Sequence, residues 1–229
     1  MKSFSRRTFL QAAGVSAAAV GFGGVLSACA SDSGSGSSDK GATSKSEGHA
    51  SQVTVSMPVS SEPAAGFDPF VSWGCGEHVH EPLIQSTLLT TTADMGFEND
   101  LATAYSCSDD GLTWTFTIRT DAKFTNGKAL TAHDVAYTIN GVANSEASEC
   151  DLTMVDKAVA VDDETCEIHL SKPFNAFLYT LAVIGIVPDG GHGSDYGTNP
   201  IGSGRYMLEQ WDHGQQVILK ANPDYYGDA

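Results

Sequence analysis

Apolar and polar residues alternate most regularly between residues 113 and 119. Threonines and Arg119 occupy every second position, and the positions between them hold the large apolar side chains Trp114, Phe116 and Ile118. A period of two with many β-branched and aromatic residues is typical of a strand that buries one face. Because the turn signal Asp109-Asp110-Gly111 comes just before it, the sequence predicts a half-buried strand over 113–119.

The residues after this strand predict a turn and then a helix. Asn126-Gly127 favours a turn in which the backbone takes a positive φ. Thr131 and Asp134 have the spacing of a weak capping box, and Val135 and Ile139 give the following residues an apolar stripe. The expected unit is therefore a strand, a turn and a helix, with an apolar face on both elements.

The same patterns predict elements along the rest of the chain. Strands are expected near 52–57 and over 101–108, 158–161, 165–170, 206–210 and 216–220. A helix or helical turn is expected over 77–87 and a helix over 173–181. Residues 184–187 are expected to form a short apolar strand or a buried connection, and residues 189–197 a glycine-rich loop.

The N-terminal residues predict an export signal. Residues 5–10 contain a twin-arginine motif, and a weakly apolar run rich in Ala and Gly follows it. Leu26-Ser27-Ala28-Cys29 then has the form of a bacterial lipobox. We expect residues 1–28 to be a twin-arginine lipoprotein signal peptide and Cys29 to carry the lipid that anchors the protein. An ordinary signal peptide with an incidental cysteine is the alternative.

Composition divides the remainder into a tether and a globular part. Residues 29–50 are dominated by Ser, Gly, Asp and Lys, which predicts a disordered tether with a reach of roughly 25 Å. Residues 51–229 are expected to be globular. The chain has 28 acidic and 12 basic residues and a net charge of −16. This acidity argues against a nucleic-acid partner, because phosphates require a basic surface.

Two clusters of reactive side chains give little support to a metal site or an enzyme. Glu77 and His80 would share a face of the predicted helix, but their spacing matches no zinc site, so no metal is expected and these two remain weak candidates. His192, Ser194 and Asp195 lie close together in the glycine-rich loop. No nucleophile elbow surrounds Ser194, and no phosphate-binding loop follows the glycines, so we expect neither enzymatic activity nor a cofactor.

Four cysteines besides Cys29 could form disulfides in an exported protein: Cys75, Cys107, Cys150 and Cys166. Two of them, Cys107 and Cys166, occupy core-facing positions of predicted strands and could be buried thiols instead. We expect at least one disulfide, without a defined pairing.

Four stretches of the chain together resemble one protein family. The longest, SDDGLTWTFTIR…AKFTNGKALTAHDVAYTI, spans 108–139. Three shorter motifs stand in the family's order: His80-Glu81-Pro82-Leu83, Pro200–Tyr206 and Asn222–Gly227. They resemble the bacterial extracellular solute-binding proteins of family 5, which serve peptide and nickel ABC importers. The resemblance covers roughly residues 53–227.

The resemblance implies an α/β fold. The expected architecture is the first lobe of a type II periplasmic-binding-protein-like structure, with mixed sheets, flanking helices and an incomplete second lobe. Family members are typically more than twice as long, so residues 51–229 are expected to be a truncated N-terminal lobe. The chain would then be a fragment of a longer coding sequence or the product of a broken gene.

The resemblance also implies a function. The protein is expected to be a substrate-binding lipoprotein of an ABC importer, anchored to the outer face of the cell membrane or periplasmic. It would capture peptides or similar small solutes and deliver them to a membrane permease. Capture of nickel or a metal chelate is the alternative within the family, and an exported cofactor enzyme is a third interpretation.

The resemblance places the loop after the first predicted strand beside the ligand cleft, which makes Phe70, Trp73 and His78 candidate ligand contacts. Packing of Phe70 in the core is the alternative. Arg205 stands where the family commonly has proline, and either has no role or binds an anionic group such as a peptide C-terminus. His80 stands where the family usually has an aromatic residue, so a packing role competes there with a metal role.

Overall fold

The computed structural model describes residues 53–56, 58–71, 74–75, 78–79 and 82–227. The chain separates into two compact units, Met1–Val53 and Thr54–Ala229, and nearly all described residues belong to the second unit. The predicted signal peptide, Cys29 and the tether lie outside the described residues. So do three of the predicted site residues, Trp73, Glu77 and His80, together with the side chains of Cys75 and His78.

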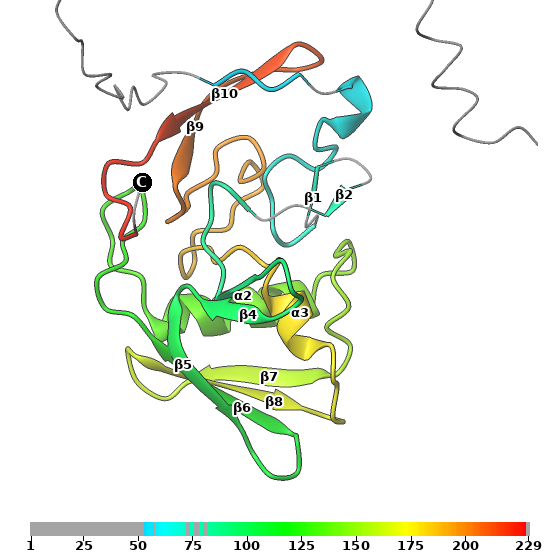
Figure 1. Cartoon of the computed structure of the whole chain (residues 1–229), viewed down its shortest axis with the longest axis vertical. Coiled ribbons are helices and arrows are strands. Elements are labelled where there is room, and N and C mark those ends of the chain that lie inside the picture. The colour runs from blue at the N-terminus through cyan, green and yellow to red at the C-terminus, as the bar shows by residue number, and fades with distance from the viewer. Residues whose placement is uncertain (1–52, 57, 72–73, 76–77, 80–81, 228–229) are drawn as a thin grey trace, which may run out of the picture. The chain divides into compact units, whose positions relative to one another are not determined.

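A four-stranded antiparallel sheet is the largest sheet of the second unit's described residues and lies at the lower end of the picture in Figure 1. Its strands are β5 (Ala102–Cys107), β6 (Thr113–Ile118), β8 (Thr165–Leu170) and β7 (Val155–Ala160), in that spatial order. These strands confirm the predictions for 101–108, 113–119 and the hairpin of 158–161 with 165–170. All pairings between described strands are antiparallel, whereas the family resemblance implied mixed sheets.

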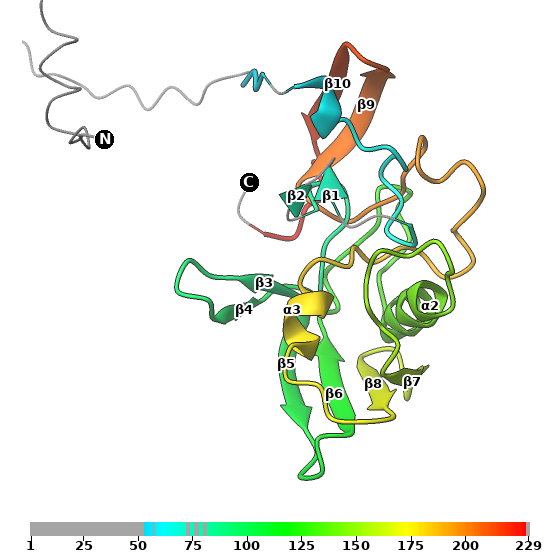
Figure 2. The ribbon, with the colours of Figure 1, turned by 90° about the vertical axis from the view of Figure 1, so that its right-hand side faces the viewer.

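One face of the sheet carries the core. Phe116 and Ile118 on β6 are 0% and 1% exposed, and Cys166 and Ile168 on β8 are both fully buried. The helix α2 (Ala132–Ala143) packs against β7 and β8 and runs along this face (Figure 2). Every second side chain of β6 therefore points into the core. This explains the alternation of apolar residues and confirms the predicted half-buried strand.

Polar side chains of α2 bind backbone groups of neighbouring segments. Asp134 accepts the N–H of Thr131 at 2.7 Å, which completes the predicted capping box, and also the N–H of Asp189 at 2.8 Å. The hydroxyl of Thr138 accepts the N–H of Val187 at 3.0 Å. These bonds satisfy buried backbone groups that would otherwise require a strand partner, so residues 184–187 are a buried connection rather than a strand.

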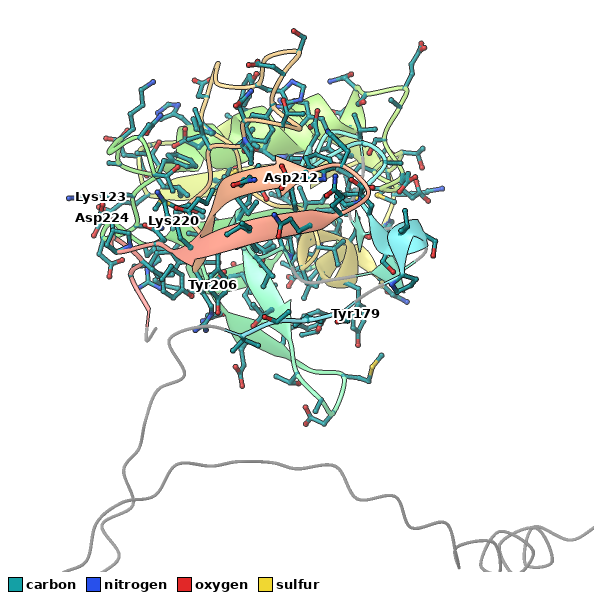
Figure 3. All side chains as sticks on the ribbon, turned by 90° about the horizontal axis from the view of Figure 1, so that it is seen from above. Lys123, Tyr179, Tyr206, Asp212, Lys220 and Asp224 are labelled. Carbon is teal, nitrogen blue, oxygen red and sulfur yellow. The ribbon has the colours of Figure 1, made fainter. Side chains whose placement is uncertain are left out.

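Short hairpins and helices complete the unit. The hairpins pair β1 (Gly74–Cys75) with β2 (His78–Val79), β3 (Leu89–Thr91) with β4 (Phe97–Asn99), and β9 (Tyr206–Asp212) with β10 (Gln216–Ala221). Figure 3 looks onto the β9–β10 hairpin and marks Asp212 and Lys220 on it. The helices are the 3₁₀ turn η1 (Val59–Ser61) and α3 (Phe177–Leu181). The prediction of two strands near the C-terminus is confirmed, and the helix predicted over 173–181 forms only over Phe177–Leu181.

Two predicted elements are wrong. Residues 53–56 form no strand, and Val53 and Val55 are 78% and 73% exposed, because no described strand pairs with them and buries their side chains. The helix predicted over 77–87 is absent from the described residues of that span, which form β2 and a bent, irregular segment over 82–87. Pro82 offers a physical reason, since a proline inside a helix removes a hydrogen bond and clashes with the preceding turn.

The three cysteines with described side chains are free thiols, so they do not form the expected disulfide. Cys166 is buried as predicted, and burial raises its pKa to about 12. Cys150 is partly buried, with its pKa raised by burial to about 11. Cys107 was expected in the core but is exposed, because it ends the edge strand β5, which buries only its first residue.

Candidate functional site

The loop implied to lie beside the ligand begins with a turn at residues 67–71. The carboxylate of Asp68 accepts the N–H of Phe70 at 2.9 Å, and the carbonyl of Asp68 accepts the N–H of Val71 at 3.2 Å. The Phe67 N–H donates to the carbonyl of Gly197 at 2.9 Å, and the Phe67 carbonyl accepts the side-chain amide of Gln85 at 2.9 Å. The backbone is therefore held from several sides just before the stretch that contains Trp73 and His78.

Phe70 packs as a core residue. Its side chain is 8% exposed and stacks on the His192 ring, with centroids 4.0 Å apart and planes at 13°. It also fills the space left by Gly141 of α2, where an added Cβ would lie 2.2 Å from the Phe70 Cε2 atom. The structure thus favours the packing interpretation for Phe70 over an exposed aromatic platform.

A histidine–carboxylate pair joins this turn to the glycine-rich loop. His192 Nε2 lies 2.9 Å from each carboxylate oxygen of Asp68, and their side chains are 23% and 12% exposed. The sequence placed His192 beside Ser194 and Asp195, but in the folded chain its carboxylate partner is Asp68. No local signal could have identified this contact, because 124 residues separate the two side chains.

The other end of the loop is held by the motif at Pro200–Tyr206. The carbonyl of Ile84 accepts the N–H of Gly204 at 2.8 Å, and the carbonyl of Leu83 accepts the N–H of Tyr206 at 3.1 Å. At Gly202 an added Cβ would lie 1.9 Å from the Ile84 carbonyl oxygen. The glycines of this motif therefore allow two backbone segments to approach more closely than any side chain would permit.

Arg205 lies over the ring of Tyr225. Its guanidinium carbon is 5.1 Å from the centre of the Tyr225 ring. Both residues line a small cavity of about 90 Å³, together with Asp100 and residues of the segment 82–87. A carboxylate shares this cavity, which reduces the attraction that Arg205 alone would exert on an anion.

Asp100 is the most constrained carboxylate near this cavity. It accepts the Tyr226 hydroxyl at 2.5 Å and the N–H of Thr87 at 3.3 Å, and the Arg119 guanidinium lies 3.9 Å above the Tyr226 ring. Burial raises the pKa of Asp100, and the hydrogen bonds from Tyr226 and Thr87 oppose this effect without overcoming it. Asp100 therefore links the C-terminal motif to the body of the domain at a cost in electrostatic stability.

The substitution Asp100→Asn is expected to change how stability depends on pH. Because folding raises the pKa of Asp100 above its ordinary 3.8, protonation stabilises the folded state fully below that value. The stabilisation is lost as the pH rises through the folded-state pKa. The variant does not titrate here, so rising pH should shift the difference in unfolding free energy in its favour. Urea unfolding of both proteins between about pH 3.5 and pH 7 measures this, and a constant difference contradicts it.

A larger cavity of about 380 Å³ lies along β9. It is lined by residues 198–200 and 208–211 and by His213. Glu62 fixes one wall, since its carboxylate accepts the Trp211 indole N–H at 2.7 Å and the N–H of Gly214 at 3.0 Å. These two hydrogen bonds, that from Gly214 foremost, lower the pKa of Glu62 below its ordinary value.

The described residues give no support for a metal centre. Within them, no group of three or more His, Cys, Asp and Glu side chains is placed to hold a metal ion. The weak candidates Glu77 and His80 lie outside this part of the chain, so their role stays untested. None of the helices that these residues form is long and apolar enough to cross a membrane.

Comparison with curated proteins gives a consistent set of relatives. The probable D,D-dipeptide-binding periplasmic protein DdpA of Escherichia coli is 38% identical over 146 residues, which are 57% of this chain and 28% of DdpA. Protein XP55 of Streptomyces lividans is 32% identical over 93% of this chain and 38% of its own length. The glutathione-binding protein GsiB of Salmonella typhimurium is 34% identical over 58% of this chain and 28% of its own length. The chain thus spans well under half the length of these relatives.

Solved structures share the fold. NikZ from Campylobacter jejuni, in complex with Ni(L-His), aligns with a TM-score of 0.63 and 28% identity over 72% of this chain and 34% of its own. The oligopeptide-binding protein AppA from Bacillus subtilis, in complex with a nonapeptide, aligns with a TM-score of 0.57 and 28% identity over 63% of this chain and 31% of its own. The expected fold class is confirmed.

The family assignment follows from the match to a description of the family's middle region. The model "Bacterial extracellular solute-binding proteins, family 5 Middle" matches residues 96–229. This range contains β5, β6 and α2, the elements that the alternation of apolar residues predicted, and the motif from Pro200 to Tyr206. The chain belongs to the bacterial extracellular solute-binding proteins of family 5.

Proposed function

We propose that this chain is part of the substrate-binding lipoprotein of an ABC importer, which captures peptides or similar small solutes outside the membrane and delivers them to a permease. The observation that carries the proposal is the family match over residues 96–229. The relatives support peptides as the ligand class, since DdpA, GsiB and AppA are named for binding a D,D-dipeptide, glutathione and oligopeptides. The relatives are binding proteins, so we propose that this protein too acts without enzymatic chemistry.

The geometry supports a ligand contact in the loop that contains Trp73 and His78. The turn at 67–71 holds the start of this loop, and the Gly202–Gly204 backbone holds its end near Ile84. A loop fixed at both ends can present side chains to a ligand with little loss of conformational entropy. We propose Trp73 and His78 as contacts, with Phe70 as their support. Arg205, in its separate cavity, is the candidate for an anionic group of the ligand.

The proposed attachment to the membrane rests on the sequence of residues 1–50. Lipidation of Cys29 and a tether over 29–50 would hold the binding domain close to its permease. Replacement of Cys29 by serine is the direct test, because serine offers no thiol for the lipid. The protein is expected in the membrane fraction of its host, and the variant in the soluble fraction. Equal distribution of both proteins contradicts the anchor.

Capture of a nickel chelate is the second candidate function. It is favoured by the alignment with NikZ, which binds Ni(L-His) and is 28% identical to this chain. Isothermal titration of the protein, expressed from its natural reading frame, with a D,D-dipeptide, glutathione, a nonapeptide and Ni(L-His) separates the candidates. Binding of one or more peptides, and none of the chelate, is the expected result. Binding of Ni(L-His) alone would establish the second function, and binding of no compound would count against both.

A further inference from the structure

The proposed function leaves unused a histidine that contacts the base of the candidate ligand loop. We infer that His192 is a positioning residue for ligand binding, which acts by holding Asp68 and Phe70 and thereby fixes the start of the loop that contains Trp73 and His78. This inference deepens the proposed function and rests on it. It concerns the contact between two loops, and His192 itself is not proposed to touch the ligand.

His192 is the side-chain partner of the Asp68 carboxylate. His192 Nε2 is 2.9 Å from both carboxylate oxygens. An ionised carboxylate only accepts hydrogen bonds, so the Nε2–H group of His192 is the donor and the carboxylate oxygens are the acceptors. The Asp68 side chain is only 12% exposed, so little water can bind its carboxylate. The N–H of His192 takes the place of a water hydrogen bond. His192 therefore compensates the burial of the Asp68 charge.

Asp68 in turn shapes the backbone of the loop. Its Oδ1 atom accepts the N–H of Phe70 at 2.9 Å, in the manner of a side chain that closes its own turn. Loss of the His192 donor would leave Asp68 free to rotate toward water and release that N–H. The effect would pass directly to Phe70 and Val71, the last described residues before position 74.

The ring of His192 also packs directly on the ring of Phe70. The two rings stack at 4.0 Å, and the Cε2–Cζ edge of the Phe70 ring packs into the space at Gly141. The Tyr196 ring, 5.5 Å from His192, ties the same loop to Gln85 through its hydroxyl. His192 thus makes two separate contacts. Its Nε2 atom orients Asp68 and its ring face orients Phe70, so a substitution can remove one contact and keep the other.

Two variants of His192 distinguish these tasks. His192→Phe keeps a ring on Phe70 and removes the donor to Asp68. His192→Gln keeps an N–H donor and removes the ring. His169→Phe is the matched control, because His169 on β8 also lies near a carboxylate, at 3.4 Å from Glu167, and is 29% exposed. Figure 1 places β8 far from the β1–β2 hairpin of the loop.

Hydrogen exchange of the full chain gives a readout that needs no ligand. In His192→Phe the amides of Phe67, Phe70 and Val71 should exchange about tenfold faster than in the wild type, since one charge-assisted hydrogen bond is lost. The amides of α2 and β6 should be unchanged, and His192→Gln should recover part of the protection. Unchanged exchange at residues 67–71, or an equal rise across the whole domain, overturns the inference.

Ligand binding provides the second readout. The probes are a D,D-dipeptide, glutathione, a nonapeptide and Ni(L-His), and the one that the wild type binds is used for the variants. His192→Phe should weaken its affinity about tenfold, measured at a temperature at which both proteins are fully folded, and His169→Phe should bind like the wild type. Unchanged affinity in His192→Phe overturns the inference. If the wild type binds none of the probes, the proposed function fails, and hydrogen exchange alone decides the role of His192.

Discussion

Replacing Gly202 by alanine is expected to destabilise the protein by about 3 kcal/mol or more. The added Cβ would lie 1.9 Å from the Ile84 carbonyl oxygen and 2.5 Å from its carbon. Both atoms belong to the backbone, and the same Ile84 carbonyl accepts the N–H of Gly204. A movement that relieves the clash must therefore break the hydrogen bond that holds the segment. Urea unfolding of the variant, or its failure to accumulate as soluble protein, measures the effect.

Gly193→Ala is the matched control for this substitution. Its added Cβ would have as nearest neighbour only the Asp195 carboxylate, at 3.2 Å, the mobile end of an exposed side chain. We expect a change within about 0.5 kcal/mol for this variant. A similarly small loss for Gly202→Ala would show that the segment 83–85 does not pack against this motif. It would also remove one of the two supports proposed for the candidate ligand loop.

Replacing Phe116 by alanine is expected to cost about 3–5 kcal/mol of unfolding free energy. Phe116 is 0% exposed and lies on β6, one of the two inner strands of the sheet. Its ring is 5.9 Å from the ring of Tyr105 and 6.4 Å from that of Trp114. The cavity left by the removed ring lies in a rigid part of the core, so the surroundings have little freedom to fill it. Denaturant unfolding of both proteins provides the measurement.

Tyr105→Ala tests whether burial is the cause. Tyr105 lies directly opposite Phe116 on β5 but is 37% exposed. Both substitutions remove an aromatic ring from the same face of the sheet, and only Phe116→Ala opens an enclosed cavity. We therefore expect the loss for Tyr105→Ala to be less than half that for Phe116→Ala. Equal losses would contradict the position of Phe116 at the centre of the core.

The elements predicted correctly are those whose signals are local. The alternation of Trp114, Phe116 and Ile118 reports which face of β6 is buried, because side chains of a strand point alternately to its two faces. The capping box of Thr131 and Asp134 likewise involves residues three positions apart. Gly127 adopts a φ of 83°, as the turn signal at Asn126-Gly127 requires. Each of these features depends on neighbours that the sequence itself supplies.

The wrong predictions concern segments whose structure depends on distant partners. Val53 and Val55 have the pattern of a strand, but a strand needs a second strand to bind its backbone groups. The segment 82–87 has the apolar spacing of a helix, but it packs closely against the glycines of the motif at Pro200–Tyr206, more than 110 residues later. In both cases the local pattern was present and the long-range contact decided the outcome.

The same distinction applies to the candidate site. The sequence by itself determined the family, the central strand–turn–helix unit and the loop in which ligand contacts are proposed, because these follow from motifs and from periodic burial. Only the tertiary structure decided that Phe70 packs against α2, that His192 binds Asp68 and that Arg205 shares a cavity with Asp100. These pairs come from segments far apart in the chain, and their contacts depend on backbone geometry that no local pattern of residues encodes.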